Sequence, residues 1–333
     1  MTEIVSTTPG LYPLPNWAKE DLKDLKGNQK DDLISGNEGE EIEAAYGDVR
    51  TEFIEAQEAA SLDRIVECQG RWDDMLAHPL AVNDSVETRG IVRYYDNNNF
   101  YREPVVTDEL AATGDVAREL EAASEQVAGG LQAVLPGPYS LADLATDEYY
   151  EDSEEFLAAI ADFLAAETDL LPEVETLFLL EPSLVENAPE DGEDERASEA
   201  IDAVASAADG DTDVVVHPYW GALEEKVYAH VMDADIDGLG FDLIADHDAN
   251  VYNAQEYGTP AEVSLGVVDG QNTLVESPET IRERLEWFTE QTPQNDYDRI
   301  YATINTETFY LPINRFEEKL EALGAVQKTE VTA

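Results

Sequence analysis

The stretches Thr176–Ser183 (TLFLLEPS) and Asp213–Trp220 (DVVVHPYW) decide the fold. Each begins with a short unbroken apolar core and ends in a polar residue followed by proline. Strands that are buried on both faces of a parallel sheet have this composition. The pattern recurs along the chain, and the eight expected strands are Ile4–Thr8, Arg64–Gln69, Gln132–Pro136, Thr176–Glu181, Asp213–His217, Gly238–Asp242, Val263–Asp269 and Arg299–Asn305.

Helix-like segments lie between these strands, for example Ser153–Glu167, Glu195–Ala208 and Pro278–Gln291. Eight strand–helix units in 333 residues favour the α/β class and a single (β/α)₈ TIM-type barrel over residues 1–327. Residues 328–333 are expected to form a flexible C-terminal tail. An open doubly wound sheet is the alternative, and it is less favoured because no glycine-rich dinucleotide fingerprint follows any strand.

One β-like segment interrupts the alternation. Val86–Tyr95 (VETRGIVRYY) continues into DNNNFYREP, and we expect an inserted β-ribbon after the second strand, near the barrel mouth. Further along, Ala188–Ala197 (APEDGEDERA) has the composition of a charged surface loop.

The charge balance is strongly acidic, with 19 basic against 75 acidic residues and a net charge of −56. High salt screens the self-repulsion of such a surface, so we expect a halophilic, acidic protein of a high-salt cytoplasm. No basic stripe exists to neutralise phosphates, which argues against nucleic acid as a partner. The sequence also predicts no membrane segment, because no apolar run reaches 18 residues. Cys68 is the sole cysteine, so no internal disulfide and no multi-cysteine metal site can form within one chain.

In a (β/α)₈ barrel the functional residues lie at the carboxyl ends of the strands. There the sequence places acidic, aromatic and amide side chains that suit an amino acid or a flat heterocycle better than a phosphate. The candidate residues for binding a substrate or donor are Glu67, Gln69, Trp72, Asp74, Asn97, Asn98, Asn99, Tyr139, Ser140, Glu181, Tyr219, Trp220, Asp269, Asn272, Asn305 and Glu307.

Two of these residues, and the pair His217 and Asp242, allow more than one interpretation. Ser140 (in LPGPYSLA) is a candidate N-cap whose neighbouring backbone N–H groups bind a carboxylate, or it only caps its own helix. Trp72, in RWDDM, either stacks on a ligand ring or covers the barrel top. His217 and Asp242 end neighbouring strands, and they either face one ion, act as acid and base, or are ordinary structural residues. Two such ligands fall short of the three or four that zinc needs.

Several motifs, in order along the chain, resemble the cobalamin-independent methionine synthase family. They are TTPGLYPLP, ECQGRWDDML, LPGPYSLA, LLEPSL, VVHPYWG and LGVVDGQNTLVESPETIRERL. The segment RYYDNNNFYREPVV is more similar to the family's amino-terminal barrel, which is thought to help bind folate. The resemblance implies methyl transfer from a reduced pterin or folate donor to homocysteine, with a zinc ion that holds the thiol as thiolate.

The family's zinc ligands are a His, two Cys and a Glu, and most are not retained. By resemblance they fall on His217, Tyr219, Thr308 and Asp242. The acid that holds the homocysteine amino group falls on Leu180, beside Glu181. This degenerate zinc site implies a methyltransferase-like protein of methionine biosynthesis that acts with a second, homologous zinc-bearing barrel chain, and it predicts substoichiometric zinc. A non-catalytic subunit that stabilises or regulates a methyltransferase, and a different acid–base enzyme on the same scaffold, are the alternatives.

Overall fold

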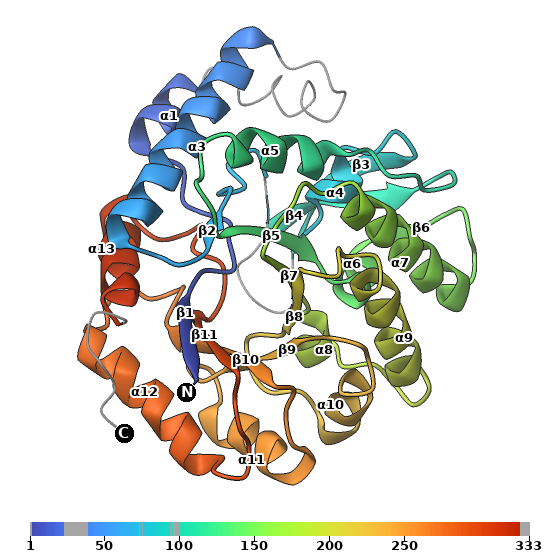
Figure 1. The fold of residues 1–333 in the computed structure, drawn as a ribbon. Coiled ribbons are helices and arrows are strands. Elements are labelled where there is room, and N and C mark those ends of the chain that lie inside the picture. Colours follow the sequence, from blue (N-terminus) through green and yellow to red (C-terminus); the bar gives the residue numbers. More distant parts are fainter. Residues whose placement is uncertain are drawn as a thin grey trace.

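The computed structural model describes residues 2–22, 39–72, 74, 76–93, 95 and 100–326. Eight parallel strands form one curled sheet at the centre of the molecule, and helices surround it (Figure 1). The order of the strands is β1 (Glu3–Ser6), β11 (Arg299–Ile304), β10 (Glu262–Val268), β9 (Gly238–Asp242), β8 (Asp213–His217), β7 (Thr176–Leu180), β5 (Leu131–Pro136) and β2 (Ile65–Val66).

The two ends of this sheet, β1 and β2, meet through one residue. The carbonyl oxygen of Ser6 accepts hydrogen bonds from the backbone N–H groups of Asp63 and Arg64, both at 3.1 Å. The Asp63 carboxylate in turn accepts from the Ser6 backbone N–H at 2.8 Å and from its hydroxyl at 2.6 Å. The predicted barrel is thus confirmed, and side-chain bonds join β1 to β2 where a regular ladder joins the other neighbours.

The eight predicted strands correspond to the eight strands of the sheet. Two of them, Asp213–His217 and Gly238–Asp242, have the predicted bounds, and β2 is much shorter than the predicted Arg64–Gln69. It ends early because Cys68 and Gln69 adopt positive φ angles of 91° and 57°, which a strand does not allow.

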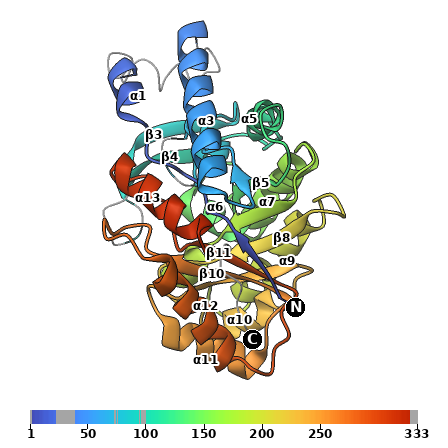
Figure 2. The same ribbon diagram turned by 60° about the vertical axis from the view of Figure 1, so that its left-hand side comes forward.

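The helices alternate with the strands and cover the outside of the barrel (Figures 1 and 2). Their amphipathic faces bury apolar residues against the sheet, as in α7, where Phe156, Ile160 and Leu164 are buried. The helices are α1 (Asn16–Asp21), α3 (Glu40–Ala60), α4 (His78–Ala81), α5 (Asp115–Ser124), α6 (Pro138–Leu144), α7 (Ser153–Asp169), α8 (Ser183–Glu186), α9 (Glu193–Ala205), α10 (Glu225–Val231), α11 (His247–Tyr257), α12 (Pro278–Gln291) and α13 (Ile313–Gly324).

The inserted ribbon after the second strand is also present. Strands β3 (Val86–Arg93) and β4 (Phe100–Val106) pair in antiparallel fashion, with an irregularity between Thr88 and Ile91. A third short strand, β6 (Thr146–Asp147), pairs with β4 in parallel and ties the ribbon to the chain after α6. The sequence analysis missed β6, because two residues are too few to show a periodic pattern.

The prediction of a surface loop over Ala188–Ala197 is wrong for its second half. Helix α9 begins at Glu193, and within the predicted loop the Asp194 side chain is buried. Its carboxylate accepts from the backbone N–H groups of Gly192 and Glu195 and pairs with Lys226 at 2.8 Å. Acidic residues at a helix N-terminus are stabilised by the helix dipole, so the charge run that suggested a loop belongs to a helix start. The predicted tail, 328–333, lies outside the described residues.

Polar residues close the barrel at the amino-terminal ends of its strands. Arg299 pairs there with Glu3 at 3.1 Å and Glu262 at 2.8 Å, and it also contacts Asp213. The Tyr301 hydroxyl donates to Asp213 at 2.9 Å and to Glu262 at 3.1 Å. These groups satisfy one another, which leaves the opposite, carboxyl end of the strands as the place for a site.

Candidate functional site

Asn305, just past β11, connects the two residues predicted as a catalytic or metal-binding pair. The His217 Nε2 donates to the Asn305 carbonyl oxygen at 3.0 Å. The side-chain amide of Asn305 donates to both carboxylate oxygens of Asp242, each at 3.1 Å, and its Oδ1 accepts from the Gly270 backbone N–H at 2.9 Å. His217 and Asp242 therefore both bond to Asn305, His217 to its backbone carbonyl and Asp242 to its side-chain amide.

The other hydrogen bonds of His217 and Asp242 occupy the remaining polar atoms of both side chains. The second ring nitrogen of His217, Nδ1, lies 3.2 Å from the Ser264 hydroxyl. Because a carbonyl oxygen only accepts, Nε2 carries the ring proton and Nδ1 is the acceptor. Asp242 accepts three more hydrogen bonds, from the backbone N–H groups of Trp220, Ile244 and Ala245 at 2.9–3.0 Å.

Burial sets the charge of both groups. His217 is fully buried, which lowers its pKa to about 4, although the bond to Asn305 opposes the shift. The imidazole is therefore neutral at neutral pH. Burial raises the pKa of Asp242, and the hydrogen bonds from Ala245, Trp220 and Asn305 counteract that rise because they stabilise the carboxylate.

These residues do not fit a zinc ion. Zinc needs three or four ligands with free lone pairs, and here the His217 nitrogens and the Asp242 oxygens are bonded within the chain. Thr308, at the position of a family cysteine, donates its hydroxyl hydrogen to the Leu11 carbonyl at 3.2 Å. Within the described ranges, no three His, Cys, Asp or Glu side chains are close enough together to hold a metal ion.

Glu181, at the end of β7, is held by the start of helix α6. Its carboxylate accepts from the backbone N–H groups of Tyr139 at 3.0 Å and Ser140 at 2.8 Å, and from the Ser140 hydroxyl at 2.6 Å. The prediction of Ser140 as an N-cap is wrong, because Gly137 is the cap and Ser140 lies inside the helix. The helix start does bind a carboxylate, but that carboxylate is the chain's own Glu181.

Burial, followed by the charge of Asp143, raises the pKa of Glu181 to about 7, against the hydrogen bonds that lower it. Gly137 is required here, since a Cβ at this position would lie 2.2 Å from the Glu181 side chain. Glu181 is thus a buried carboxyl group that titrates near neutrality beside the barrel mouth.

Aromatic rings lie next to this carboxyl group. The Trp220 ring packs edge-on against Tyr95 at 5.1 Å and against Tyr219 at 4.8 Å, and the Tyr95 hydroxyl lies 2.8 Å from the Ser183 hydroxyl. Trp220 and Tyr95 both have positive φ angles, at 72° and 43°, which cost free energy in residues other than glycine. Such strain occurs where the surrounding structure fixes a side chain in position.

Three acids converge on the same rings. Burial raises the pKa of Tyr219 well above its ordinary value, and the charges of Glu307, Glu181 and Asp74 raise it further. Asp74 also accepts from the backbone N–H groups of Leu76 and Ala77 at 2.9 and 2.7 Å. Of the sequence-predicted residues, Tyr219 and Trp220 are thus in ring contact, and Glu307, Glu181 and Asp74 are close enough to act on Tyr219 electrostatically.

Gln69 occupies a strained loop that joins the ends of β1 and β2. Its Oε1 accepts from the Leu11 backbone N–H at 2.7 Å, which fixes the orientation of the amide. Gly10 is required opposite, since a Cβ there would lie 2.0 Å from this oxygen. The Gln69 side-chain nitrogen, Nε2, is buried and has no hydrogen-bond partner in the described part of the chain. An unpaired buried donor is costly, so an acceptor from outside the chain would stabilise this position.

Glu67 and Cys68 support this loop from behind. Glu67 pairs with Arg50 at 3.2 Å and accepts from the Gln69 backbone N–H at 2.9 Å. Burial and the charge of Glu119 raise the pKa of Glu67 to about 8. The pKa of the buried Cys68 thiol is raised well above its usual range, again by burial, so the thiol stays protonated.

Other predicted residues serve local structure. The Trp72 ring stacks on His78 with ring centres 5.0 Å apart, so one of its faces is already covered by the chain itself. Tyr139 donates its hydroxyl hydrogen to the Asn187 carbonyl at 2.9 Å. Asp269 and Asn272 form an exposed turn in which Asp269 accepts from the Asn272 backbone N–H at 3.1 Å. Asn97, Asn98 and Asn99 lie outside the described residues.

The sequence analysis did not single out Asp143 and Ser183 as members of this site. Asp143 accepts from the Ser183 hydroxyl at 2.7 Å and from the Asn187 side-chain amide at 2.8 Å. The one signal for Ser183 was its place just after a predicted strand end, two residues beyond Glu181.

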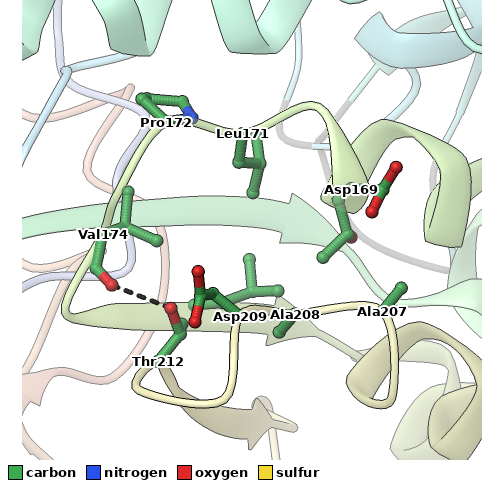
Figure 3. A pocket seen from close by; sticks show the side chains of 10 residues that line it. Asp169, Leu171, Pro172, Val174, Ala207, Ala208, Asp209 and Thr212 are labelled. Atoms are coloured by element: carbon green, nitrogen blue, oxygen red, sulfur yellow. Dashed lines mark hydrogen bonds between the residues drawn. The ribbon is translucent and has the colours of Figure 1, made fainter.

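A separate pocket of about 190 Å³ opens at the amino-terminal ends of β7 and β8 (Figure 3). Asp169, Leu171 and Asp209 line it, and the Thr212 hydroxyl closes one side through a 2.8 Å bond to the Val174 carbonyl. This end of a barrel serves stability rather than chemistry, so the pocket is not the candidate site.

The fold and the polar carboxyl end define a single-barrel α/β protein of the kind that binds small molecules at the mouth of the barrel. Residues 76–293 match the sequence model of a family described as "Cobalamin-independent synthase, N-terminal domain". The chain belongs to this family, and the match to its N-terminal domain agrees with the resemblance of the ribbon segment.

Curated relatives are named methionine synthase. The protein from Saccharolobus solfataricus is 24% identical over 300 residues, which cover 85% of this chain and 83% of the relative. The one from Sulfurisphaera tokodaii is 24% identical over 282 residues, covering 83% and 78%.

Solved structures share the fold. A B12-independent methionine synthase from Shewanella sp. W3-18-1, in complex with selenomethionine, superposes with a TM-score of 0.78 at 18% identity over 97% of this chain and 96% of that one. The putative vitamin-B12-independent methionine synthase from Listeria monocytogenes gives a TM-score of 0.72 at 16% identity, over 98% and 97%. No helix in the described ranges combines the length and apolarity needed to span a membrane.

Proposed function

We propose that this protein is the donor-binding barrel of a methionine-synthase-type methyltransferase. In this role it binds a reduced pterin-type methyl donor, and a second, homologous barrel chain binds zinc and homocysteine. The observation that carries the proposal is the bonding of His217 and Asp242 to Asn305, which leaves neither side chain free for a metal ion.

The barrel mouth suits a flat, nitrogen-rich ring. Tyr95 and Trp220 offer aromatic faces and edges, and the carboxyl groups of Glu181 and Glu307 lie beside them. Carboxylates accept hydrogen bonds from ring N–H and amino groups. A pterin has such groups along one edge, and it also has a carbonyl oxygen that matches the unpaired Nε2 of Gln69. Asn97, Asn98 and Asn99, which follow the ribbon strand β3, remain predicted contributors.

The names of the relatives support the reaction class. The Saccharolobus solfataricus and Sulfurisphaera tokodaii relatives are methionine synthases, and most of this chain aligns with them. A reaction that uses a zinc thiolate needs a site that this chain does not offer, because its sole cysteine is buried and protonated. The proposal therefore assigns thiol activation to the partner barrel.

The test is methyl transfer from a methylated tetrahydropterin to homocysteine, with each chain alone and with both chains mixed. We expect turnover only from the mixture, and zinc analysis of this chain in high salt should give far less than one ion per chain. Trp220→Ala should raise the KM for the donor, whereas Trp287→Ala, which removes a tryptophan of helix α12, should not.

Two results would contradict the proposal. One is a tightly held zinc ion in this chain, and the other is full turnover by this chain alone. If the mixture needs this chain but Trp220→Ala and Gln69→Ala leave donor affinity unchanged, the chain is instead a non-catalytic stabilising subunit. Turnover of another substrate by the isolated chain would favour different acid–base chemistry.

A further inference from the structure

Outside the barrel mouth, three arginines gather around one pocket. The chain has a net charge of −56 and only twelve arginines, yet Arg50, Arg71 and Arg118 all line a pocket of about 430 Å³. It lies where α3 packs beside α5, next to the loop after β2 (Figure 1). Its other lining residues are Glu43, Tyr46, Val82, Thr113, Asp115, Glu119 and Ala122.

The acceptors in this pocket are already used by the arginines. Asp115 accepts from Arg71 at 3.1 Å, from Arg118 at 2.8 Å and from the His78 ring at 3.0 Å. Glu119 accepts from Arg71 at 3.3 Å and from Arg50. Little accepting capacity is left for a cationic ligand within the pocket.

Arg50, the most buried of the three pocket arginines, has one nitrogen that donates to no group in the pocket. Arg50 is 7% exposed, its Nε donates to Glu67 at 3.2 Å, and its Nη2 donates to Glu119. Its third nitrogen, Nη1, has no acceptor within the described ranges. Protein atoms do not fully enclose this nitrogen. Arg50 lines the pocket, and Nη1 is therefore the guanidinium nitrogen that a ligand there could use as a donor.

The charges of the lining allow a ligand with one negative charge at most. The lining has three guanidinium groups and three carboxyl groups, and two of these carboxyl groups, Asp115 and Glu119, are paired with the arginines. Behind Arg50, burial and the charge of Glu119 raise the pKa of Glu67 to about 8. The exposed Glu43 at the rim would repel a doubly charged anion. Val82 and Ala122 supply an apolar wall for a short carbon chain.

We propose that this pocket is a second ligand site, which binds the carboxylate group of a small molecule through Arg50 Nη1. The site is separate from the barrel mouth and independent of the methyl-transfer role. It connects to the mouth through one line of contacts, since Arg50 holds Glu67 and Glu67 holds the Gln69 backbone.

The test uses trifluoroacetate as the probe and fluorine NMR line broadening as the measurement. The full chain is titrated at one fixed KCl concentration, so that chloride competes equally in every sample. Acetate and L-alanine then compete with the probe in separate arms, because the carboxylate could belong to a simple acid or to an amino acid. Inorganic phosphate is the third arm.

Two variants address the site from different sides. Arg50→Lys keeps the positive charge but removes the guanidinium edge, and Ala122→Leu fills the apolar wall without touching the charged groups. Arg50→Lys should weaken probe binding by about tenfold, the usual effect of losing a hydrogen bond to a charged group. Ala122→Leu should weaken it by about as much, because the larger side chain takes up space that the probe needs. Arg196→Lys, on α9, is the matched control and should bind as the wild type does.

The proposal is supported if acetate or L-alanine competes with the probe and if both variants lose probe binding. Which of the two competes identifies the source of the carboxylate. Equal broadening in the wild type and Ala122→Leu overturns it, even if Arg50→Lys fails to fold. So does competition by phosphate alone, or no broadening in the wild type.

Discussion

Replacing Asn305 by aspartate changes a single donor group at the centre of the candidate site. The Oδ1 atom that accepts from Gly270 is retained, whereas the amide group that donates to both oxygens of Asp242 becomes an oxygen. Two carboxyl groups then face each other at about the 3.1 Å spacing of the present bonds. Unless a proton lies between them, the variant loses two hydrogen bonds to a charged group and gains a like-charge contact.

The cost follows from these contacts. Hydrogen bonds to charged groups contribute about 1.5–3 kcal/mol each, and both bonds come from one donor group, so the loss is about 3 kcal/mol or more when both groups are ionised. A shared proton restores one bond and reduces the cost to about 1 kcal/mol. In the unfolded chain both carboxyl groups titrate near pH 4, and burial already raises the pKa of Asp242 in the folded protein.

The folded variant therefore holds one more proton than the unfolded chain above pH 5, and its stability must fall as the pH rises. The limiting slope is about 1.4 kcal/mol per pH unit, and it ends where the folded pair loses its proton. Urea unfolding of variant and wild type at pH 5.5 and pH 8, in high KCl, measures the difference. We expect the destabilisation to be at least about 1.4 kcal/mol larger at the higher pH.

Asn187→Asp is the matched control, because Asn187 also donates its amide to a carboxylate, Asp143, but is exposed. Water screens that pair, so the change should cost less than about 1 kcal/mol at both pH values. A pH-independent cost for Asn305→Asp, or a cost no larger than that of the control, would refute the assignment of Asn305 as the donor between His217 and Asp242.

Three further predictions concern stability. Lys319→Met should destabilise the fold by about 3–5 kcal/mol, because the fully buried Lys319 bonds to Glu276 at 2.7 Å and to the Leu274 carbonyl at 2.6 Å, and its loss leaves the buried Glu276 carboxylate with only a 3.7 Å contact to Arg284 as an ion pair. Gly137→Ala should cost about 1–3 kcal/mol, because its Cβ would overlap the Glu181 side chain; urea midpoints measure both changes. The net charge of −56 predicts that lowering KCl from about 3 M to about 0.2 M unfolds or loosens the protein, which far-UV circular dichroism would detect.

Each has a control. Arg315→Met removes an exposed ion pair with Glu318 and should cost less than about 1 kcal/mol, while Gly210→Ala adds a Cβ that meets nothing within 4 Å. If these two variants lose as much stability as Lys319→Met and Gly137→Ala, burial and overlap are not the causes. Full secondary structure at low salt would show that charge repulsion does not limit this fold.

The barrel could be predicted because strand signals are local. Apolar runs such as TLFLL and DVVV contain the information for burial on both sides, and the bounds of β8 and β9 followed directly. The two-residue strand β6 and the start of α9 could not be read in this way. Strand β6 forms because it pairs with β4, which lies elsewhere in the chain. The start of α9 depends on the buried Asp194, which pairs with the distant Lys226.

The sequence predicted where the site residues lie in the barrel, but it did not predict their hydrogen-bond partners. Strand ends identified His217, Asp242 and Glu181, and the structure places all three at the carboxyl end of the barrel. Which acceptor each side chain uses depends on contacts across 40 to 90 residues, as with Ser140 and Glu181 or His217 and Asn305. No local pattern indicates such pairs, so a helix cap was predicted where the structure has an internal carboxylate.

The closure of the sheet has a consequence for synthesis on the ribosome. Strand β1 pairs with β11, so β1 keeps an open edge until the nearly 300 residues between the two strands have emerged. His217 and Asp242 also wait for Asn305, and until it arrives they are buried polar groups without their final partners. Until β11 is in place the barrel is an incomplete ring with an exposed strand edge, and the net charge of −56 opposes the association of neighbouring nascent chains.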